Sequence, residues 1–303
     1  MTPSAPPSGR QVEIVYGGQR ATIVEVGGGL RSYDVDGVPV LDGYAASEIC
    51  SGSRGQLLAP WPNRIDGGRY TFGGEEYQLP ITEPARHNAI HGLCAWVRWE
   101  VAELDANRCV MRYRLPPQPG YPFALQLDAE YVVDAHGLTV TVTAVNVGTH
   151  PAPFGAGHHP YLSLGATLVD ELSLQLPAAS TLATDDRMIP TGERRAVDAV
   201  TDFRTLRRVG GTQLDTCFAD LERDPAGVCH VRLEGSRSAA TLWIDAAYRY
   251  LMVYTGDTLD PGRRRRGLAV EPMTCAPDAF NSGDGMVVLE PGATHVATWG
   301  IAP

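Results

Sequence analysis

The sequence predicts an all-β protein folded as one large antiparallel β-sandwich. Glycine and proline are dense, with 33 and 23 residues respectively, and they divide the chain into short runs. Within those runs apolar and polar residues alternate, which is the pattern of half-buried strands. No stretch of about 12 residues gathers apolar side chains on one helical face, as a parallel crossover would require. Antiparallel sheets packed face to face are therefore predicted.

The strands follow from these runs in order. Runs 11–16 and 19–26 flank Gly17-Gly18, and runs 69–72 and 75–79 flank Gly73-Gly74. Two glycines between alternating segments are a hairpin signal. The remaining strands are expected at residues 125–133, 138–145, 228–233, 239–244, 250–254, 286–289 and 295–299, the last two around Pro291-Gly292.

The chain contains no linker-like segment and no repeat of fixed period. We therefore expect a disordered N-terminal tail over residues 1–10, rich in Pro and Ser, and a single domain over 11–303. The tail lacks the apolar core of a signal peptide, and no window reaches the roughly 18 apolar residues of a membrane helix. A cytoplasmic protein that does not contact membranes is the simple expectation.

The net charge and the cysteine spacing exclude some classes of partner and site. The formal net charge of -10 argues against nucleic acid as a partner, because phosphate binding needs a basic face. The basic run 263–266 follows Asp260-Pro261-Gly262 and is interpreted as a solvated loop rather than an anion site. Six scattered cysteines include no C-x-x-C pair, so most are expected to be reduced and buried.

Segment 59–68 is the first that carries chemistry. Pro60 and Pro62 stiffen the backbone before Asn63 and Arg64. A guanidinium presented in a fixed direction suits hydrogen bonding to adjacent hydroxyls. A surface turn with an exposed arginine is the alternative.

Two further segments contain histidines. His87 and His91 precede Gly92 in a short segment expected to be a loop, where His87 is exposed and His91 is held by hydrogen bonds unless it is functional. His158 and His159 are adjacent, and neighbouring residues of a strand point to opposite faces. At most one of them faces a given cleft, where an imidazole can transfer protons near pH 7. A structural histidine pair is the alternative.

Glu271 ends an apolar, strand-like run and precedes Pro272. A carboxylate at that position is costly unless it is hydrogen-bonded or used in chemistry. Desolvation would raise its pKa and make it a better base, whereas pairing with a buried arginine is the bland alternative. Asp215 is a weaker candidate of the same kind.

Taken in this order, the segments resemble the aldose 1-epimerase (galactose mutarotase) family over about residues 11–301. The motifs that carry the resemblance are Pro62-Asn63-Arg64-Ile65, His91-Gly92, His159-Pro160-Tyr161, Leu214-Asp215 and Glu271. The resemblance implies the supersandwich fold, no metal and no organic cofactor. It implies His159 as general acid and Glu271 as general base on one bound sugar. The implied sugar-binding residues are Asn63, Arg64, His91 and Asp215, with Tyr161 added from the motif of the acid.

Some points stay open at this level. His158 stands where many members carry Asn or Thr, although the His-Pro-Tyr order favours His159 as the acid. No arginine follows His91-Gly92 directly, so a neutral aldose such as glucose or galactose is expected, bound by a monomer or homodimer. A non-catalytic carbohydrate-binding protein on the same fold is the main alternative. A metal enzyme using His87, His91, His159 and Glu271 is a second.

Overall fold

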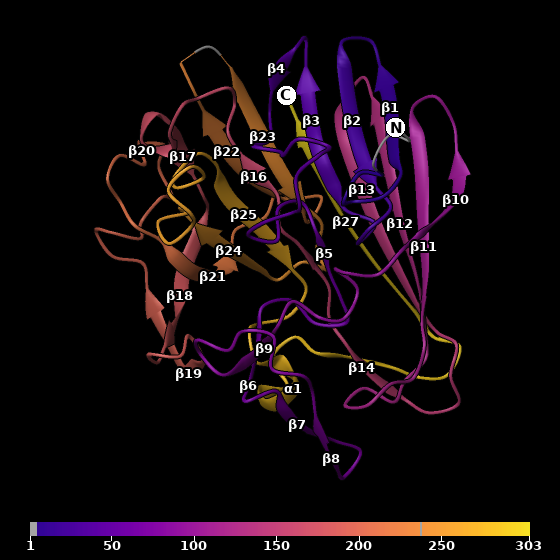
Figure 1. The fold of residues 1–303 in the computed structure, drawn as a ribbon. Helices are drawn as coiled ribbons and strands as arrows, with labels where there is room; N and C mark the ends of the chain where they lie inside the picture. Colours follow the sequence, from indigo (N-terminus) through magenta and orange to yellow (C-terminus); the bar gives the residue numbers. More distant parts are fainter. Residues whose placement is uncertain (1–4, 237) are drawn as a thin grey trace.

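The computed structural model describes residues 5–236 and 238–303, and over these residues two large antiparallel sheets face each other (Figure 1). The strands of the nine-stranded sheet, in order across it, are β10 (Glu100–Leu104), β11 (Arg108–Leu115), β12 (Leu125–Asp134), β13 (Gly137–Asn146), β27 (Thr294–Ala302), β23 (Ala239–Ile244), β22 (Cys229–Glu234), β17 (Ser173–Gln175) and β20 (Arg207–Arg208).

The eight-stranded sheet forms the second layer. Its strands are β19 (Pro190–Ala196), β18 (Ala178–Thr184), β21 (Asp215–Leu221), β24 (Tyr250–Tyr254), β25 (Leu268–Met273), β15 (Gly157–His158) and β5 (Leu57–Leu58), with β16 (Tyr161–Leu162) also paired to β25. All-β architecture as an antiparallel sandwich is thus confirmed.

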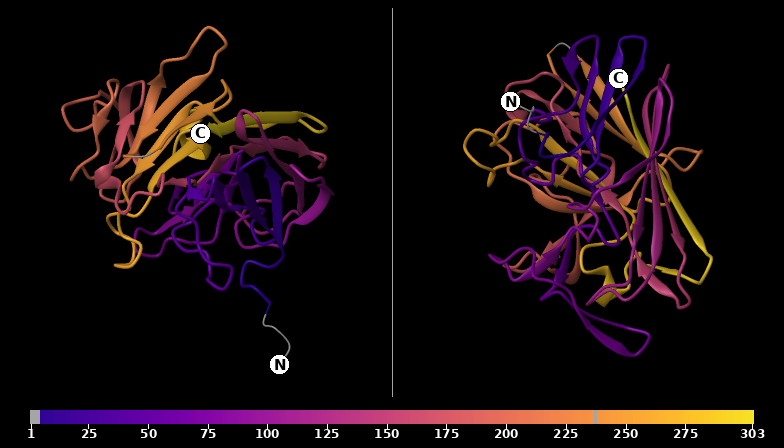
Figure 2. Two further views of the ribbon diagram at one scale, coloured as in Figure 1. Left: turned by 90° about the horizontal axis from the view of Figure 1, so that it is seen from above. Right: turned by 45° about the vertical axis from the view of Figure 1, so that its right-hand side comes forward.

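Smaller elements cover the edges of the sandwich. A four-stranded sheet packs on β11 and β12 and consists of β1 (Gln11–Tyr16), β2 (Gln19–Val24), β3 (Leu30–Val35) and β4 (Val38–Pro39). Three two-stranded ribbons pair β6 (Arg64–Asp66) with β9 (Asn88–Ile90), β7 (Arg69–Phe72) with β8 (Glu75–Gln78), and β14 (Ala152–Phe154) with β26 (Val287–Leu289). Two short helical turns are η1 (Val169–Glu171) and α1 (Ala279–Ser282). Figure 2 shows the β7–β8 hairpin projecting at one end of the molecule.

The core lies between the two large sheets, and alternation along each strand sets which side chains enter it. On β25, Leu268 and Val270 pack in this core, whereas Glu271 and Met273 point to the opposite face. β24 alternates in the same way, with Met252 on the side of Glu271. The eight-stranded sheet therefore has one face in the core and one face free to build a site.

The predicted hairpins are confirmed at 11–24 and 125–146, where the paired strands turn at the expected residues. The runs around Pro291-Gly292 are also strands, but β26 pairs with β14 and β27 with β13 and β23. Local sequence does not report these partners, because they are distant in the chain. All six cysteines are free and buried, as expected.

The expected N-terminal tail lies partly outside the described residues, which begin at residue 5. For its last residues the expectation was wrong, since Ser8 and Arg10 accept backbone hydrogen bonds from Val26 and Glu25 at 3.0 Å each. These contacts continue the β1–β2 pairing past Gln11 and Val24. Among residues 5–236 and 238–303, no helix has the length and hydropathy needed to cross a membrane.

Candidate active site

A cavity of about 270 Å³ lies between the outer face of the eight-stranded sheet and the β6–β9 ribbon, and we call it the site cavity. In Figure 1 the ribbon lies below this sheet, together with α1. The seven residues singled out from the sequence all line it: Asn63, Arg64, His91, His159, Tyr161, Asp215 and Glu271. The segments that bear them are up to about 200 residues apart, so tertiary folding alone brings them together.

Strand register places the two acidic groups on one face. Glu271 on β25 lies opposite Met252 on β24, which in turn lies opposite Cys217 on β21. Directly paired residues of a sheet share a face, and so do residues two apart along a strand. Asp215, two residues before Cys217, therefore lies on the face of Glu271. Apolar neighbours including Met252 and Cys217 surround this part of the sheet.

The two histidines at 158 and 159 point to opposite sides of the sheet, as the strand geometry predicts. His158 ends β15 and is fully buried between the sheets. His159 follows in the link to β16 and lines the site cavity. Of the two histidines, His159 is thus the one that faces the cleft, and His158 faces the core.

Hydrogen bonds fix the role of His158. Trp299 Nε1 donates to its Nδ1 at 3.1 Å, so that nitrogen carries no proton. The hydroxyl of Tyr131 donates to the carbonyl of Gly28 at 2.6 Å and therefore accepts from Nε2 of His158 at 3.2 Å. Both ring nitrogens are used, and burial lowers the pKa of His158 to about 3. His158 is a neutral structural residue.

His159 and Glu271 form a buried pair in which Nε2 lies 3.2 Å from Oε1. They are 5% and 2% exposed. Nδ1 of His159 and Oε2 of Glu271 have no hydrogen-bond partner among the described residues. Buried polar atoms normally have one, so two unpaired atoms on neighbouring residues of the cavity wall mark this pair as unusual.

Desolvation pushes the two pKa values in opposite directions. Burial, followed by the charge of Asp215, raises the pKa of Glu271 well above its ordinary range. Burial, followed by His91, lowers the pKa of His159 well below 6.5. Both shifts favour uncharged forms, so the pair holds one proton near neutral pH. Titratable groups with such displaced pKa values are typical of acid–base sites.

The Asn63 and His91 loops hold each other in place. Both residues adopt left-handed backbone conformations, with φ of 55° and 63°. The His91 N–H donates to the Asn63 carbonyl at 2.9 Å, and the Asn63 N–H donates to Nδ1 of His91 at 3.3 Å. Gly92 packs so closely on the backbone of Ala59 that a Cβ would lie 2.0 Å from its carbonyl oxygen. Glycine is therefore required in the His-Gly motif.

The contact from Asn63 determines what His91 can bind. Because Nδ1 accepts a hydrogen bond, Nε2 of the neutral ring carries the proton. Burial and then the charge of Arg64 lower the pKa of His91 to about 3, which keeps the ring neutral. His91 therefore presents a hydrogen-bond donor, suited to a sugar oxygen.

The same proton bears on the metal hypothesis. Ligand atoms of His91, His159 and Glu271 lie within 4.8 Å of one another, which is compatible with an ion. A metal at Nε2 of His91 would require Nδ1 to carry the proton, but Nδ1 is already an acceptor. His87 is exposed and lies outside this group, contrary to the four-residue set considered from the sequence. The residues fit a metal poorly.

Arg64 is buried, not exposed on a turn, because Glu83 neutralises it. Its Nε and Nη2 donate to the two carboxylate oxygens of Glu83 at 2.8 and 2.9 Å. Arg86 and Asn88 donate to the same carboxylate at 3.0 and 3.2 Å. These hydrogen bonds outweigh the effect of burial and lower the pKa of Glu83. Arg64 is thus held rigidly at the cavity wall.

Sequence reasoning missed several residues of the site. Glu83, which orients Arg64, lies in the polar stretch before Pro84 but matches no recognised motif. Met252 and Tyr254 line the cavity from β24 and had been assigned only as strand residues.

Tyr161 does line the cavity, but its hydroxyl donates to the carbonyl of Gly52 at 2.9 Å. Its ring stacks on His159 with centroids 4.9 Å apart.

Comparisons with known proteins agree with this architecture. The sequence profile of aldose 1-epimerase matches residues 10–301. YihR of Escherichia coli K12, a protein described as uncharacterized, is 37% identical over 95% of this chain and 91% of its own. Galactose mutarotase of Mus musculus is 28% identical over 86% of this chain and 79% of its own.

Solved structures give the same fold. The GalM/aldose epimerase homologue of C. elegans superposes with a TM-score of 0.85 at 22% identity, covering 97% of this chain and 98% of its own. The galactose 1-epimerase of Lactobacillus acidophilus NCFM superposes with a TM-score of 0.79 at 20% identity, covering 96% and 98%. With the profile match across nearly its whole length, this chain belongs to the aldose 1-epimerase family.

Proposed function

We propose that the protein is a mutarotase that interconverts the α and β anomers of an aldose. The observation that carries the proposal is the buried His159–Glu271 pair at the wall of a small cavity that Asn63, Arg64, His91 and Asp215 also line. At about 270 Å³ the cavity is at the lower end of ligand sites, which suits one sugar ring better than an oligosaccharide.

The reaction needs two proton transfers at oxygens bonded to the same carbon. Glu271 takes the proton of the anomeric hydroxyl while His159 gives a proton to the ring oxygen. The bond from C1 to the ring oxygen breaks, and a carbonyl forms at C1. After rotation about C1–C2 the two transfers reverse and the ring closes on its other face. Two groups 3.2 Å apart suit oxygens that share one carbon.

The proton count closes over this cycle. In ring opening His159 gives its proton to the ring oxygen and Glu271 receives a different proton, from the anomeric hydroxyl. The neutral pair favoured by burial is therefore the pair that accompanies the open-chain sugar. Ring closure restores the charged pair. The direct contact between Nε2 and Oε1 provides a route for the proton between the two residues when the cavity holds no sugar.

The remaining groups of the site cavity suit hydroxyl binding. Neutral His91 donates through Nε2, and Arg64 presents a rigid donor. Burial raises the pKa of Asp215, which accepts from a hydroxyl or donates when protonated. Arg64 and Arg86 already share the Glu83 carboxylate, so among the described residues that line the cavity no arginine pair is left free for an anionic group. This balance supports a neutral aldose such as glucose or galactose.

Polarimetry tests the proposal. The protein should accelerate the optical-rotation change of freshly dissolved α-D-glucose or α-D-galactose, and EDTA should have no effect. His159→Asn and Glu271→Gln should each lower kcat/KM by about 10²–10⁴-fold. His87→Asn, an exposed histidine outside the cavity, is the matched control and should retain full activity.

The substrate panel must extend beyond neutral sugars. Glucuronate and glucose 6-phosphate test the charge argument, since faster turnover of either than of every neutral aldose would overturn the neutral-sugar proposal. Sugar binding by calorimetry without any acceleration would instead support the carbohydrate-binding alternative. Normal activity in either active-site variant would remove that residue from the mechanism.

A further inference from the structure

A buried arginine stands behind the proposed acid without lining the site cavity. The guanidinium carbon of Arg54 lies 4.4 Å from the ring centroid of Tyr161, and that ring stacks on the imidazole of His159 at 18°. Arg54 is 3% exposed. Tyr161 is fixed at its far end by the hydrogen bond from its hydroxyl to Gly52. The ring of Tyr161 therefore contacts both the arginine and the histidine.

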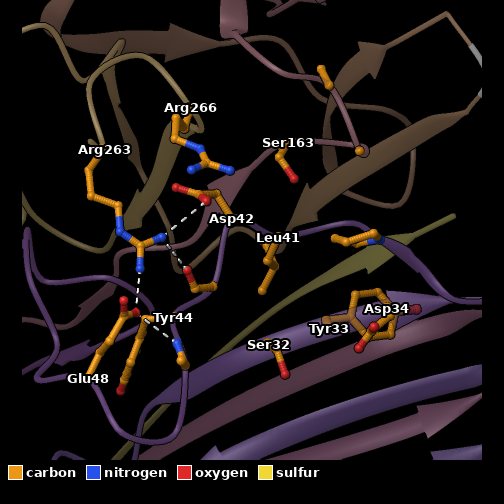
Figure 3. Close-up of a pocket in the computed structure, with 15 residues that line it drawn as sticks. Ser32, Tyr33, Asp34, Leu41, Asp42, Tyr44, Glu48, Ser163, Arg263 and Arg266 are labelled. Carbon is orange, nitrogen blue, oxygen red and sulfur yellow. Dashed lines mark hydrogen bonds and ion pairs between the residues drawn. The ribbon is translucent and has the colours of Figure 1, made fainter. Parts of the chain in front are cut away.

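Arg54 is held by an ion pair that extends to the surface. Its Nη2 donates to Oδ2 of Asp42 at 3.0 Å, and its Nη1 donates to the carbonyl of Ser51 at 3.0 Å. Asp42 also lines a second cavity, of about 590 Å³, in which Arg263 lies between Asp42 and Glu48 (Figure 3). Arg263 approaches Oδ1 of Asp42 at 3.6 Å.

This contact changes the interpretation of the basic run 263–266. Arg263 donates to the carbonyl of Gly43 and pairs with Glu48. Arg265 pairs with Asp170 and Asp257 at 2.8 and 2.7 Å. At least two of the four arginines are therefore cross-links between loops, and Arg263 closes the outer side of the Asp42–Arg54 pair.

We propose that Arg54 is a positioning residue for His159, which fixes the imidazole plane through the ring of Tyr161 and places a buried positive charge behind it. The inference rests on the proposed function of His159. A buried ion pair is a weak source of stability, because its desolvation cost offsets most of the attraction. A charged pair stacked behind an acid–base histidine has a clearer use in setting the orientation and proton affinity of that histidine.

The sign of the effect follows from the charges around His159. The titratable and charged groups nearest to His159 are Glu271, His91, Tyr161 and, behind Tyr161, Arg54. The others that line the same cavity are Arg64, Glu83, Arg86, Asp215 and Tyr254. Arg54 is a minor contributor to the lowered pKa of His159, after burial and His91. Its charge favours the proton on Glu271, whereas Asp42 partly cancels that charge.

Nitrogen-15 NMR of the histidine rings, followed while the pH is lowered from 7, tests this without requiring activity, because the ring of His159 is neutral at the start. In Arg54→Met the ring of His159 should become imidazolium at a higher pH than in wild type, since the opposing charge is gone. In Asp42→Asn it should become imidazolium at a lower pH than in wild type, since Arg54 is no longer neutralised. Arg54→Lys retains the charge and should stay near wild type. Arg263→Met removes an arginine that contacts Asp42 but lines the second cavity rather than the site cavity, and should also match wild type.

Opposite shifts in the Arg54 and Asp42 variants support the proposal, because simple loosening of the packing would move both signals in one direction. Equal shifts, or none, would overturn it. If Arg54→Met fails to fold, the Asp42→Asn and Arg54→Lys spectra still decide the sign.

Kinetics supply the second readout. Arg54→Met should lower kcat about tenfold while KM changes less than about twofold, as expected for a group that orients the acid without touching substrate. A large rise in KM with unchanged kcat would contradict a positioning role. Absence of mutarotation in the wild-type protein would instead refute the proposed function, and the NMR shifts would still report on Arg54.

Discussion

Replacing His158 with asparagine should destabilise the protein without reducing its activity, although the residue adjoins the proposed acid. The imidazole of His158 bridges the two sheets through Tyr131 and Trp299. Asparagine can still accept from Trp299 through Oδ1, but it cannot reach the hydroxyl of Tyr131. The variant thus loses one buried hydrogen bond and leaves a small void beside fully buried aromatic rings.

The magnitude can be worked from these two losses. A lost buried hydrogen bond costs about 1 kcal/mol. A void of about 40 Å³ costs about 1 kcal/mol more. With an unfolding entropy of about 2 cal/mol/K per residue, a loss of about 2 kcal/mol lowers Tm by about 3 °C for this chain length.

The assay pairs thermal unfolding with polarimetry at 25 °C. His158→Asn should show the lower Tm, with kcat within about twofold of wild type because the site cavity is untouched. His159→Asn should not lower Tm, since it removes a desolvated imidazole, but it should lose activity, since it removes the group that transfers the proton. Loss of activity in His158→Asn at unchanged Tm would refute the assignment of the two faces.

Three further predictions follow from the same structure. The pKa of His158 falls from about 6.5 in the unfolded chain to about 3 in the folded protein, so the buried neutral ring contributes its full stability above pH 6.5. On acidification the free energy of unfolding should decrease, by about 2 kcal/mol at pH 5. Urea titrations of wild type and His158→Asn at pH 7 and pH 5 measure this decrease. The pair of His159 and Glu271 holds its single proton between a lowered and a raised pKa, so kcat/KM should stay level from about pH 6 to pH 7.5, whereas a decline centred near 6.5 would show an ordinary histidine. Glu83→Gln frees Arg64 from its bidentate partner and should raise KM about tenfold with a smaller change in kcat, and an unchanged KM would mean that Arg64 does not bind the sugar.

The fold class follows from the sequence because hairpin strands are local. Gly17-Gly18 and the alternation around it specify β1 and β2, and the run 134–137 does the same for β12 and β13. Pairings between distant strands, such as β14 with β26, depend on the closure of the whole sandwich and leave no local pattern. The hydrogen bonds of Ser8 and Arg10 to the residues just after β2 likewise escaped prediction, since a short Pro- and Ser-rich segment lacks periodicity.

For the candidate site, too, some features follow from the sequence and others depend on the tertiary structure. The sequence by itself determined which residue types carry the chemistry, because His159, Glu271, Asn63 and Arg64 lie in motifs whose Pro and Gly neighbours constrain the backbone. Only the tertiary structure decided that His158 faces the core, that Glu83 neutralises Arg64, and that Arg54 lies behind Tyr161. The physical reason is that a side chain's face and its partner depend on strand register and on sheet packing. Those contacts join residues far apart in the chain, and no local pattern encodes them.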